Sequence, residues 1–375
     1  MSVTVRPIES KTDVMKFIKS QWNFYKGDPN FVPPLIMDRE KLLNKQKNPF
    51  YQHAEMQLFL AEENGTVVGR IAAIINHNHN KTHNDKIGFF GFFECVHNQQ
   101  VANQLFDVAC AWLRERGMTD VRGPMNPSIN DECSFLVDGF TSPPVMLMAY
   151  NPPYYAALAE GYGFHKEMDM YAYYLRQENF RSEKMQRLVG MLEQRSKVKI
   201  RQMDFKNKAQ FNRDVAALKK IYDEAWEHNW GSIRFTEAEF DFLANDLKQI
   251  AEPALALIAE IDGEVIGFGL ALPDINQCLI HNKNGGILGG VWHLLTKKKK
   301  INLCRIIALG VLPEHRKSGI ETILYNYIGT NAQKLNNMNG EASWILETND
   351  MMNRGLQQTM HGERYKTYRI YQKPL

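Results

Sequence analysis

Polar residues that could bind a ligand follow one predicted strand in the first half of the chain. Asn126, Asn130, Asp131 and Glu132 come at or just after the end of the segment Asp120–Met125, which we predict to be a strand. Side chains just beyond strand ends are where α/β folds usually hold their ligands. We therefore predict that these four residues bind a substrate.

The segment that begins at Asn151 adds an aromatic candidate to this set. Asn151 has the residue type of a helix N-cap, and the two prolines that follow it suit a first helical turn. A capping role alone accounts for Asn151. Tyr154 is a candidate substrate-binding residue if its ring faces the pocket, and Tyr155 is the alternative.

Histidines and cysteines raise the question of a metal or thiol site. His77, His79 and His83 lie close together, but no Cys, Asp or Glu stands at a zinc-ligand spacing from them. We predict a solvated loop and no bound metal. The five cysteines are scattered, which is typical of reduced thiols in a cytoplasm. Cys133 has no histidine near it in the sequence, which argues against a catalytic thiol.

A basic run follows an apolar segment in the second half of the chain. Lys297–Lys300 is a run of four lysines directly after Ile287–Leu295. Runs of like charge are usually solvated surface. The lysines could also attract the phosphates of a ligand or, together with the apolar segment, a membrane surface.

Length and charge narrow the class of protein. A chain of 375 residues favours two domains. The 45 basic and 42 acidic residues give a net charge of +3, which argues against a nucleic-acid partner. No apolar stretch approaches the roughly 20 residues that cross a bilayer, and the segment Met1–Pro7 lacks a leader pattern. We expect a cytoplasmic protein without stable membrane insertion, either a monomer or a homodimer.

The sequence contains an internal repeat. Asn64-Gly65 and Asp262-Gly263 each lie between two apolar segments, at an offset of 198 residues, and each predicts a tight hairpin turn. Asn151 and Leu158 match Asn349 and Leu356 at the same offset. Two separated matches at one offset indicate two copies of one domain.

Both copies predict the same order of elements. Each has a first strand, one or two helices, a hairpin, a further apolar strand, a helix, a strand, a short helix and a closing tyrosine-rich strand. The predicted fold class is α/β (mixed α+β), with a mixed twisted sheet flanked by helices in each domain. We predict domains at residues 1–178 and 195–375, with the polar stretch Gln177–Arg187 at or just before the boundary.

This order resembles the GCN5-related N-acetyltransferase (GNAT) superfamily. The local match is the run from Leu309 to Ile320, a strand followed by a Val-Leu-Pro segment, a basic residue and a glycine before a helix. The chain is similar to tandem members of the superfamily, and it looks like an uncharacterised bacterial group of acyl-CoA N-acyltransferase-like proteins. Segment Gly123–Glu132 of the first copy is part of that likeness.

The resemblance implies a coenzyme A site in the second copy. Backbone N–H groups at a helix start cradle a pyrophosphate, and glycine permits its close approach. Glu321 stands where the family has Gly or Ala. The equivalent loop of the first copy, Glu94–Gln100, has no glycine, so the first copy is expected to form the acceptor side. The implied acetyl-CoA or longer acyl-CoA site consists of Leu309, Val311, Arg316, Lys317, Ser318, Gly319 and Ile320.

The resemblance also implies catalytic roles for two residues. Glu347, at the end of the strand beside the cofactor loop, is the candidate general base, and a solvated strand-end carboxylate is the alternative. The family's thiolate-protonating tyrosine falls at Leu356, which has no acid. Tyr365 is the nearest substitute by sequence, and a tyrosine packed on the closing strand is its alternative.

Three functions are compatible with these features. The first is an acyl-CoA-dependent N-acyltransferase that acts on a small-molecule or peptide amine. The second is a non-catalytic binding protein with a degenerate GNAT fold, which Glu321 and Leu356 favour. The third is a FemX-like aminoacyl transferase, which would need an extended basic face for a tRNA.

Overall fold

The computed structural model describes residues 3–227 and 229–375, which form two compact units. The first unit contains residues 3–169, Leu279–His293 and Lys366–Leu375. The second unit contains Met170–Cys278 and Leu294–Tyr365. Met1 and Ser2, the start of the segment without a leader pattern, lie outside the described residues.

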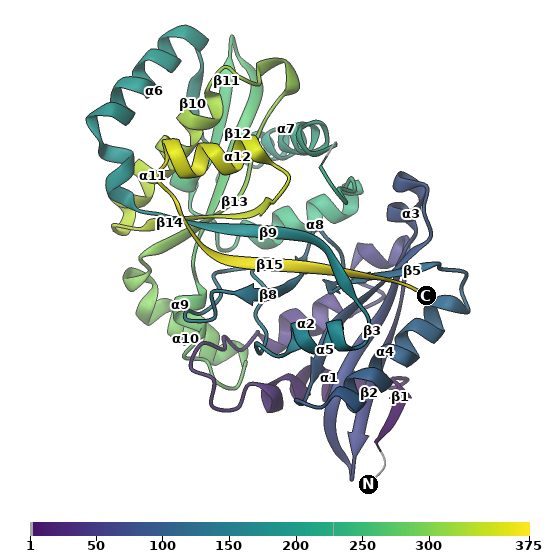
Figure 1. Ribbon diagram of the computed structural model, residues 1–375. Helices are drawn as coiled ribbons and strands as arrows, with labels where there is room; N and C mark the ends of the chain where they lie inside the picture. The colour runs from purple at the N-terminus through teal and green to yellow at the C-terminus, as the bar shows by residue number, and fades with distance from the viewer. Residues whose placement is uncertain (1–2, 228) are drawn as a thin grey trace. The chain divides into compact units, whose positions relative to one another are not determined.

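The predicted elements follow one another along the chain in the predicted order, with further short elements in the connections between them (Figure 1). The strands are β1 (Thr4–Pro7), β2 (Ala54–Glu63), β3 (Thr66–Asn76), β4 (Ile87–Cys95), β5 (Asp120–Gly123), β6 (Met125–Asn126), β7 (Glu132–Cys133), β8 (Phe135–Asp138), β9 (His165–Leu175), β10 (Lys199–Gln202), β11 (Ala256–Ile261), β12 (Glu264–Pro273), β13 (Leu303–Val311), β14 (Asn339–Leu346) and β15 (Glu363–Pro374). The helices are α1 (Lys11–Phe24), α2 (Ile36–Leu42), α3 (His77–His83), α4 (Gln99–Arg114), α5 (Tyr155–Gly161), α6 (Glu183–Ser196), α7 (Lys208–Trp226), α8 (Glu237–Leu247), α9 (Asn276–Leu279), α10 (Ile287–Lys297), α11 (Ile320–Asn336) and α12 (Asp350–Arg354).

The sheet of each unit has the same strand order. In the first unit the order is β1-β2-β3-β4-β5-β15, and β8 pairs with β15. In the second unit it is β10-β11-β12-β13-β14-β9. The first four strands are antiparallel, the fourth and fifth are parallel, and the sixth is antiparallel to the fifth. The predicted mixed sheet with flanking helices is confirmed in both copies.

The closing tyrosine-rich strands form where the sequence predicted them. Each of them pairs with a strand of the other sequence copy. In the second unit, Met170–Leu175 of β9 pairs with Gly340–Leu346 of β14. In the first unit, the last residues of β15 pair with β5 and β8. Each sheet is therefore completed by a strand from the other sequence copy.

Both hairpin turns have the backbone that the repeat predicts. Asn64 and Gly65 have φ of 50° and 78°, and Asp262 and Gly263 have φ of 51° and 85°. Two consecutive residues with positive φ define the type I′ turn, whose twist matches that of antiparallel strands. The turn dipeptides therefore fix the register of β2 with β3 and of β11 with β12.

A matching ion network supports the repeat in three dimensions. In each unit an arginine of the first strand binds a glutamate of the second strand and an aspartate of the first helix. The two networks are recognised by their equivalent positions in the two units, and no shared sequence motif marks them. The pairs are Arg6 with Glu62 and Asp13, and Arg201 with Glu260 and Asp214.

Two local predictions were wrong. His77, His79 and His83 lie in α3 rather than in a solvated loop, and His79 is buried with its ring edge against Phe89. Burial lowers the pKa of His79 to about 4, so its imidazole is neutral at pH 7.

Asn151 is not a helix cap. Helix α5 begins at Tyr155 with Tyr154 at the N-cap position, and the buried amide of Asn151 instead holds Leu136 of β8. Its Oδ1 accepts from the Leu136 N–H at 2.7 Å, and its Nδ2 donates to the Leu136 carbonyl at 3.2 Å. In the second copy, Asn349 does cap α12, through the Met352 N–H.

These two asparagines give a matched test of stability. Asn151→Ala leaves two buried backbone groups of Leu136 without partners, and we expect a loss of about 2–3 kcal/mol. Asn349→Ala removes one helix cap and should cost about 1 kcal/mol. Urea unfolding of both variants measures the difference, and a larger loss in Asn349→Ala would contradict this account.

Candidate active site

The two central parallel strands of the second unit separate partway along their length. β13 and β14 pair only from Leu303 with Asn339 to Ile306 with Ala342. Beyond that point β13 continues along β12 as far as Val311, and β14 continues along β9 as far as Leu346. The fork between their carboxyl ends frees backbone groups that would otherwise pair with each other.

The hydrogen bonds of β13 show which of its backbone N–H groups point toward this fork. The N–H of Leu312 donates to the Ile266 carbonyl of β12 at 2.9 Å. Because successive N–H groups point to opposite edges of a strand, those of Val311 and Leu309 point toward the fork. The ladder also shifts by one residue at Ile307, an irregularity of the kind that often lies beside binding sites.

The loop after β13 leads directly into α11. Lys317 and Gly319 have positive φ values of 67° and 83°, and Gly319 is the N-cap residue of α11. The Arg316 guanidinium donates to the Ala225 carbonyl at 2.9 Å, and the Ser318 hydroxyl donates to the His315 carbonyl at 2.5 Å. The loop is thus tied to α7 and closed by an internal hydrogen bond, with the first N–H groups of α11 at its end.

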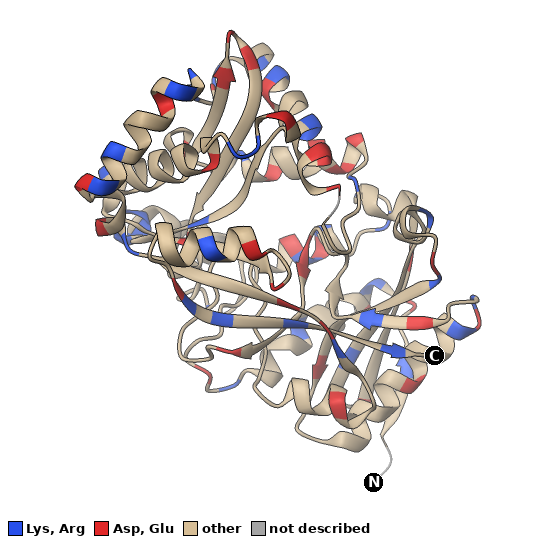
Figure 2. Cartoon of the chain, turned by 45° about the horizontal axis from the view of Figure 1, so that its top comes forward, with Lys and Arg blue, Asp and Glu red and all other residues tan. Residues whose placement is uncertain are grey.

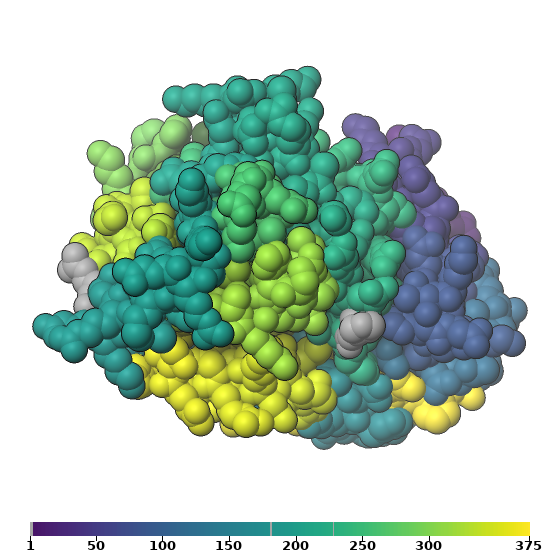
Figure 3. Space-filling model, turned by 90° about the horizontal axis from the view of Figure 1, so that it is seen from above, coloured from purple at the N-terminus to yellow at the C-terminus, as the bar shows by residue number. Residues whose placement is uncertain are grey.

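Glycine at position 319 meets two constraints. A side chain there would be strained at this φ, and a Cβ would also meet Leu192 of α6 at 2.6 Å. Helix α6 lies at the surface of this unit beside the start of α11 (Figure 3). Gly319 therefore permits both the helix start and the packing of α6 against it.

Glu321 stands where the family pattern has Gly or Ala. It lies in the first turn of α11 and is partly buried. Burial raises the pKa of its carboxyl above the value of an exposed glutamate.

The two catalytic candidates are not brought together. Glu347 follows the last residue of β14, at the open end of the fork, and is partly buried. The Tyr365 hydroxyl donates to the buried Glu341 carboxylate. Glu341 lies six residues before Glu347, about 20 Å along an extended strand. Leu356, at the family's tyrosine position, is buried.

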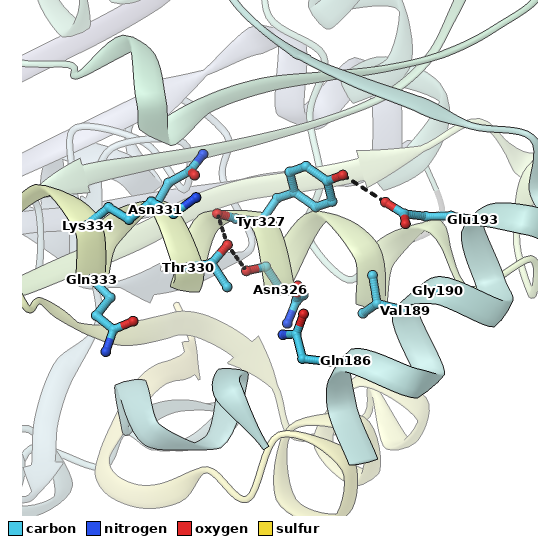
Figure 4. A pocket seen from close by; sticks show the side chains of 10 residues that line it. All are labelled: Gln186, Val189, Gly190, Glu193, Asn326, Tyr327, Thr330, Asn331, Gln333 and Lys334. Atoms are coloured by element: carbon cyan, nitrogen blue, oxygen red, sulfur yellow. Dashed lines mark hydrogen bonds between the residues drawn. The ribbon is translucent and has the colours of Figure 1, made fainter. Parts of the chain in front are cut away.

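A groove of about 560 Å³ lies elsewhere in the second unit, between α6 and α11 (Figure 4). Gln186 and Glu193 line it from α6, and Tyr327, Asn331 and Lys334 line it from α11. The Tyr327 hydroxyl donates to Glu193 at 2.8 Å across the groove. Its lining is entirely helical and includes none of the expected cofactor residues.

The corresponding fork of the first unit is filled by its own chain. β4 and β5 pair from Ile87 to Phe89 and then separate. The Phe92 N–H donates to Asn126 Oδ1 at 2.5 Å, and a Cβ on Gly91 would meet the Met125 carbonyl oxygen at 1.7 Å. The segment after β5 therefore occupies the space between the separating ends of β4 and β5.

The predicted polar cluster forms one hairpin. Asn126 and Glu132 face each other across the β6–β7 pair, and Asn126 Nδ2 donates to Glu132 at 3.0 Å. Arg39 of α2 donates to the other oxygen of Glu132 at 3.0 Å. Asp131 accepts from the Ser128 hydroxyl at 2.6 Å. Asn130 lies in the same turn, where its N–H donates to the Ser128 hydroxyl oxygen.

Tyr154 lies at the carboxyl end of β4. Its hydroxyl donates to the Cys95 carbonyl at 2.9 Å, and its ring stacks on His97. Burial raises its pKa to about 12, so it stays protonated at neutral pH. Tyr155 accepts from the Cys95 N–H at 3.0 Å, and the two tyrosines together occupy the backbone groups at this strand end.

A buried charged network in the first unit was missed by the sequence interpretation. Glu94 accepts from the Tyr155 hydroxyl at 2.7 Å and the Tyr25 hydroxyl at 3.3 Å, and Arg70 lies 3.3 Å from it. Arg70 also donates to the Phe17 carbonyl at 2.6 Å. Burial raises the pKa of Glu94. In the sequence, the network was visible only as one charged residue in each of two mostly apolar segments.

The two units have polar and apolar side chains, respectively, at equivalent positions. Strand pairing aligns Arg70 with Phe268 and Glu94 with Gly310, and Tyr25 corresponds to the last residue of α7. In the second unit that residue, Trp226, packs against Gly310 and Phe268. The first unit thus has a hydrogen-bonded ion pair where the second has an aromatic contact beside the fork.

Comparison with known proteins agrees with this architecture. A model of the Acetyltransferase (GNAT) family matches residues 215–351, the part of the chain that holds the β13–β14 fork. The chain belongs to the GNAT superfamily. The fork, the loop after β13 and the start of α11 lie within the matched region.

Two relatives match this GNAT chain over nearly its full length. It is 33% identical over 381 residues to "Protein YghO" of Escherichia coli (strain K12), covering 99% of this chain and 95% of that protein. It is 36% identical over 383 residues to "Bacterial ceramide synthase" of Caulobacter vibrioides (strain NA1000 / CB15N), covering 100% and 98%.

Solved structures show the same tandem fold at low sequence identity. A tandem GNAT protein from the clavulanic acid biosynthesis pathway has a TM-score of 0.57 at 11% identity, covering 100% of this chain and 98% of that one. A GCN5-related N-acetyltransferase from Sphaerobacter thermophilus has a TM-score of 0.55 at 11% identity, covering 99% and 95%.

Charge, metal-ligand and membrane features complete the description. Lys and Arg are interspersed with Asp and Glu along the elements of both units (Figure 2). Among the described residues, no group of three His, Cys, Asp or Glu side chains is arranged to hold a metal. Within the same residues, no helix has the length and apolar character that a membrane crossing requires.

The buried ion pair between Arg70 and Glu94 in the first unit can be tested by its contribution to stability. Arg70→Met leaves the Glu94 carboxyl buried without its cation, and we expect a loss of about 3–5 kcal/mol in the free energy of unfolding. The double variant Arg70→Met/Glu94→Gln should recover at least half of that loss. Phe268→Met at the equivalent position is the control, with an expected cost below about 1.5 kcal/mol. Additive losses in the double variant would contradict the pairing.

Proposed function

We propose that this protein is an N-acyltransferase that moves a fatty acyl group from a coenzyme A thioester to the amine of a long-chain base. The observation that carries the proposal is the β13–β14 fork, with a glycine-capped helix start beyond it, in a chain 36% identical over its full length to a protein named bacterial ceramide synthase. A ceramide is the N-acyl product of such a base.

The backbone described above supports ligand binding at the fork. The N–H groups at the start of α11, with Arg316 and Lys317 on the loop, would receive the pyrophosphate of coenzyme A. The pantetheine arm would run along the fork edges of β13 and β14, where amide groups are not used by the neighbouring strand. The thioester carbonyl would then lie near the Val311 N–H.

The reaction needs one proton removed and one supplied. The amine nitrogen attacks the thioester carbonyl carbon, the Val311 N–H stabilises the oxyanion, and Glu347 takes the proton from nitrogen. Collapse of the tetrahedral intermediate breaks the C–S bond, and the thiolate takes a proton. Because Tyr365 is bonded to Glu341 and Leu356 carries no acid, solvent is the proposed source of that proton.

A first test asks whether the second unit binds coenzyme A. Saturating ligand at about 100 times its Kd should stabilise the native state by about 2.7 kcal/mol, and thermal melting measures the shift. We expect Arg316→Ala/Lys317→Ala to lose the shift. Arg213→Ala/Lys220→Ala, which removes two positive charges from α7, should keep it. No shift with free or acylated coenzyme A at millimolar concentration would refute the site.

A second test asks whether transfer occurs and whether Glu347 takes part. Palmitoyl-CoA and sphinganine are incubated with the protein, and the amide product and free thiol are measured together. Glu347→Gln should lower kcat by about 100-fold or more with little change in the melting shift. An unchanged kcat would remove Glu347 from the mechanism. A melting shift without transfer to any amine would favour a non-catalytic acyl-CoA-binding protein, which the buried Leu356 also favours.

A further inference from the structure

We propose that α10 docks the protein on the surface of a membrane that contains anionic lipids. This helix belongs to an insertion between β12 and β13, and the equivalent connection of the first copy contains only α3. The proposal rests on the exposed side chains of α10 and the lysines that follow it, and it stands independently of the catalytic assignment.

The exposed apolar side chains of the described residues are concentrated on α10. Leu288 is 85% exposed, Leu295 is 79% exposed and Trp292 is 65% exposed. Val291 and Ile287 are also exposed. At 100° per residue these five positions fall within an arc of about 140°, which is one continuous face of the helix. Large continuous apolar faces are rare on the surfaces of soluble proteins, and they commonly mark a site of interaction.

The opposite face of α10 fixes the helix to the protein. Gly290 is buried, and a Cβ there would meet Leu35 and Asn282. A Cβ on Gly289 would meet the Asn282 side-chain oxygen at 2.5 Å. Because the small residues face inward, the helix packs closely and presents its large apolar residues outward.

Charge identifies the partner as a lipid surface rather than a second apolar protein face. Lys297 ends α10, and Lys298–Lys300 form the exposed turn that follows. Lys298 binds Glu252 at 2.5 Å, and Lys299 and Lys300 are exposed to solvent. An apolar helical face with a tryptophan and adjacent lysines is the composition of helices that lie in the interface of anionic bilayers.

Vesicle co-sedimentation of the full-length protein tests the proposal. Vesicles of phosphatidylcholine alone are compared with vesicles containing phosphatidylglycerol, at low and high salt. We expect binding to the anionic vesicles that weakens with salt, because exposed charges are screened. Leu288→Ser/Leu295→Ser should reduce the partition coefficient at least about tenfold, because two apolar side chains no longer leave water.

Two further variants separate the contributions. Lys299→Gln/Lys300→Gln should lose about tenfold or more on anionic vesicles, with little change on neutral ones. Met191→Ser/Met351→Ser removes two other exposed apolar side chains, 62% and 67% exposed, and should bind normally. Equal partitioning of all variants would overturn the proposal.

The same variants distinguish other occupants of this face. Sedimentation velocity without lipid shows whether the Leu288→Ser/Leu295→Ser substitutions break a dimer, and a dimer lost without any change in vesicle binding would assign the face to a second copy. The coenzyme A melting shift should survive in the lysine variant. Loss of that shift with normal vesicle binding would assign the lysines to the cofactor instead.

Discussion

The end of pairing between β13 and β14 is the constraint on which the proposed chemistry depends. Up to Ile306 and Ala342 the two strands satisfy each other's backbone groups, and beyond that point each has an antiparallel partner on one side only. The inner edges then carry amide groups that an extended ligand can use. The loop after Val311 and the N-terminus of α11 follow from the same geometry, because β13 must turn away to reach its helix.

The first unit shows what the same fork does when the chain itself fills it. Asn126 takes the N–H of Phe92, and Met125 approaches Gly91 so closely that no side chain would fit there. Glu94 and its partners add a buried polar network at this strand end, where the second unit has Gly310 and Trp226. The two forks therefore differ: the first is filled by its own chain, and the second is the proposed ligand site.

The repeat, the hairpins and the order of elements could be predicted because they depend on local rules. Asn64-Gly65 and Asp262-Gly263 strongly favour type I′ turns through their own backbone preferences. The partners of β9 and β15 could not be predicted, since a tyrosine-rich strand pairs equally well with either sheet. Asn151 and His79 were misinterpreted for a similar reason: their roles depend on Leu136 and Phe89, which are distant in sequence. Glu94 and Arg70 were visible only as isolated charges in apolar strands.

Hydrogen exchange with and without palmitoyl-CoA tests whether the β13–β14 fork binds the ligand, because it reports backbone protection segment by segment. We expect slower exchange at residues 307–322 and 343–349 on ligand binding, with residues 92–101 of the first unit unchanged. Protection confined to the first-unit fork, to the groove between α6 and α11, or to no segment at saturating ligand would contradict it.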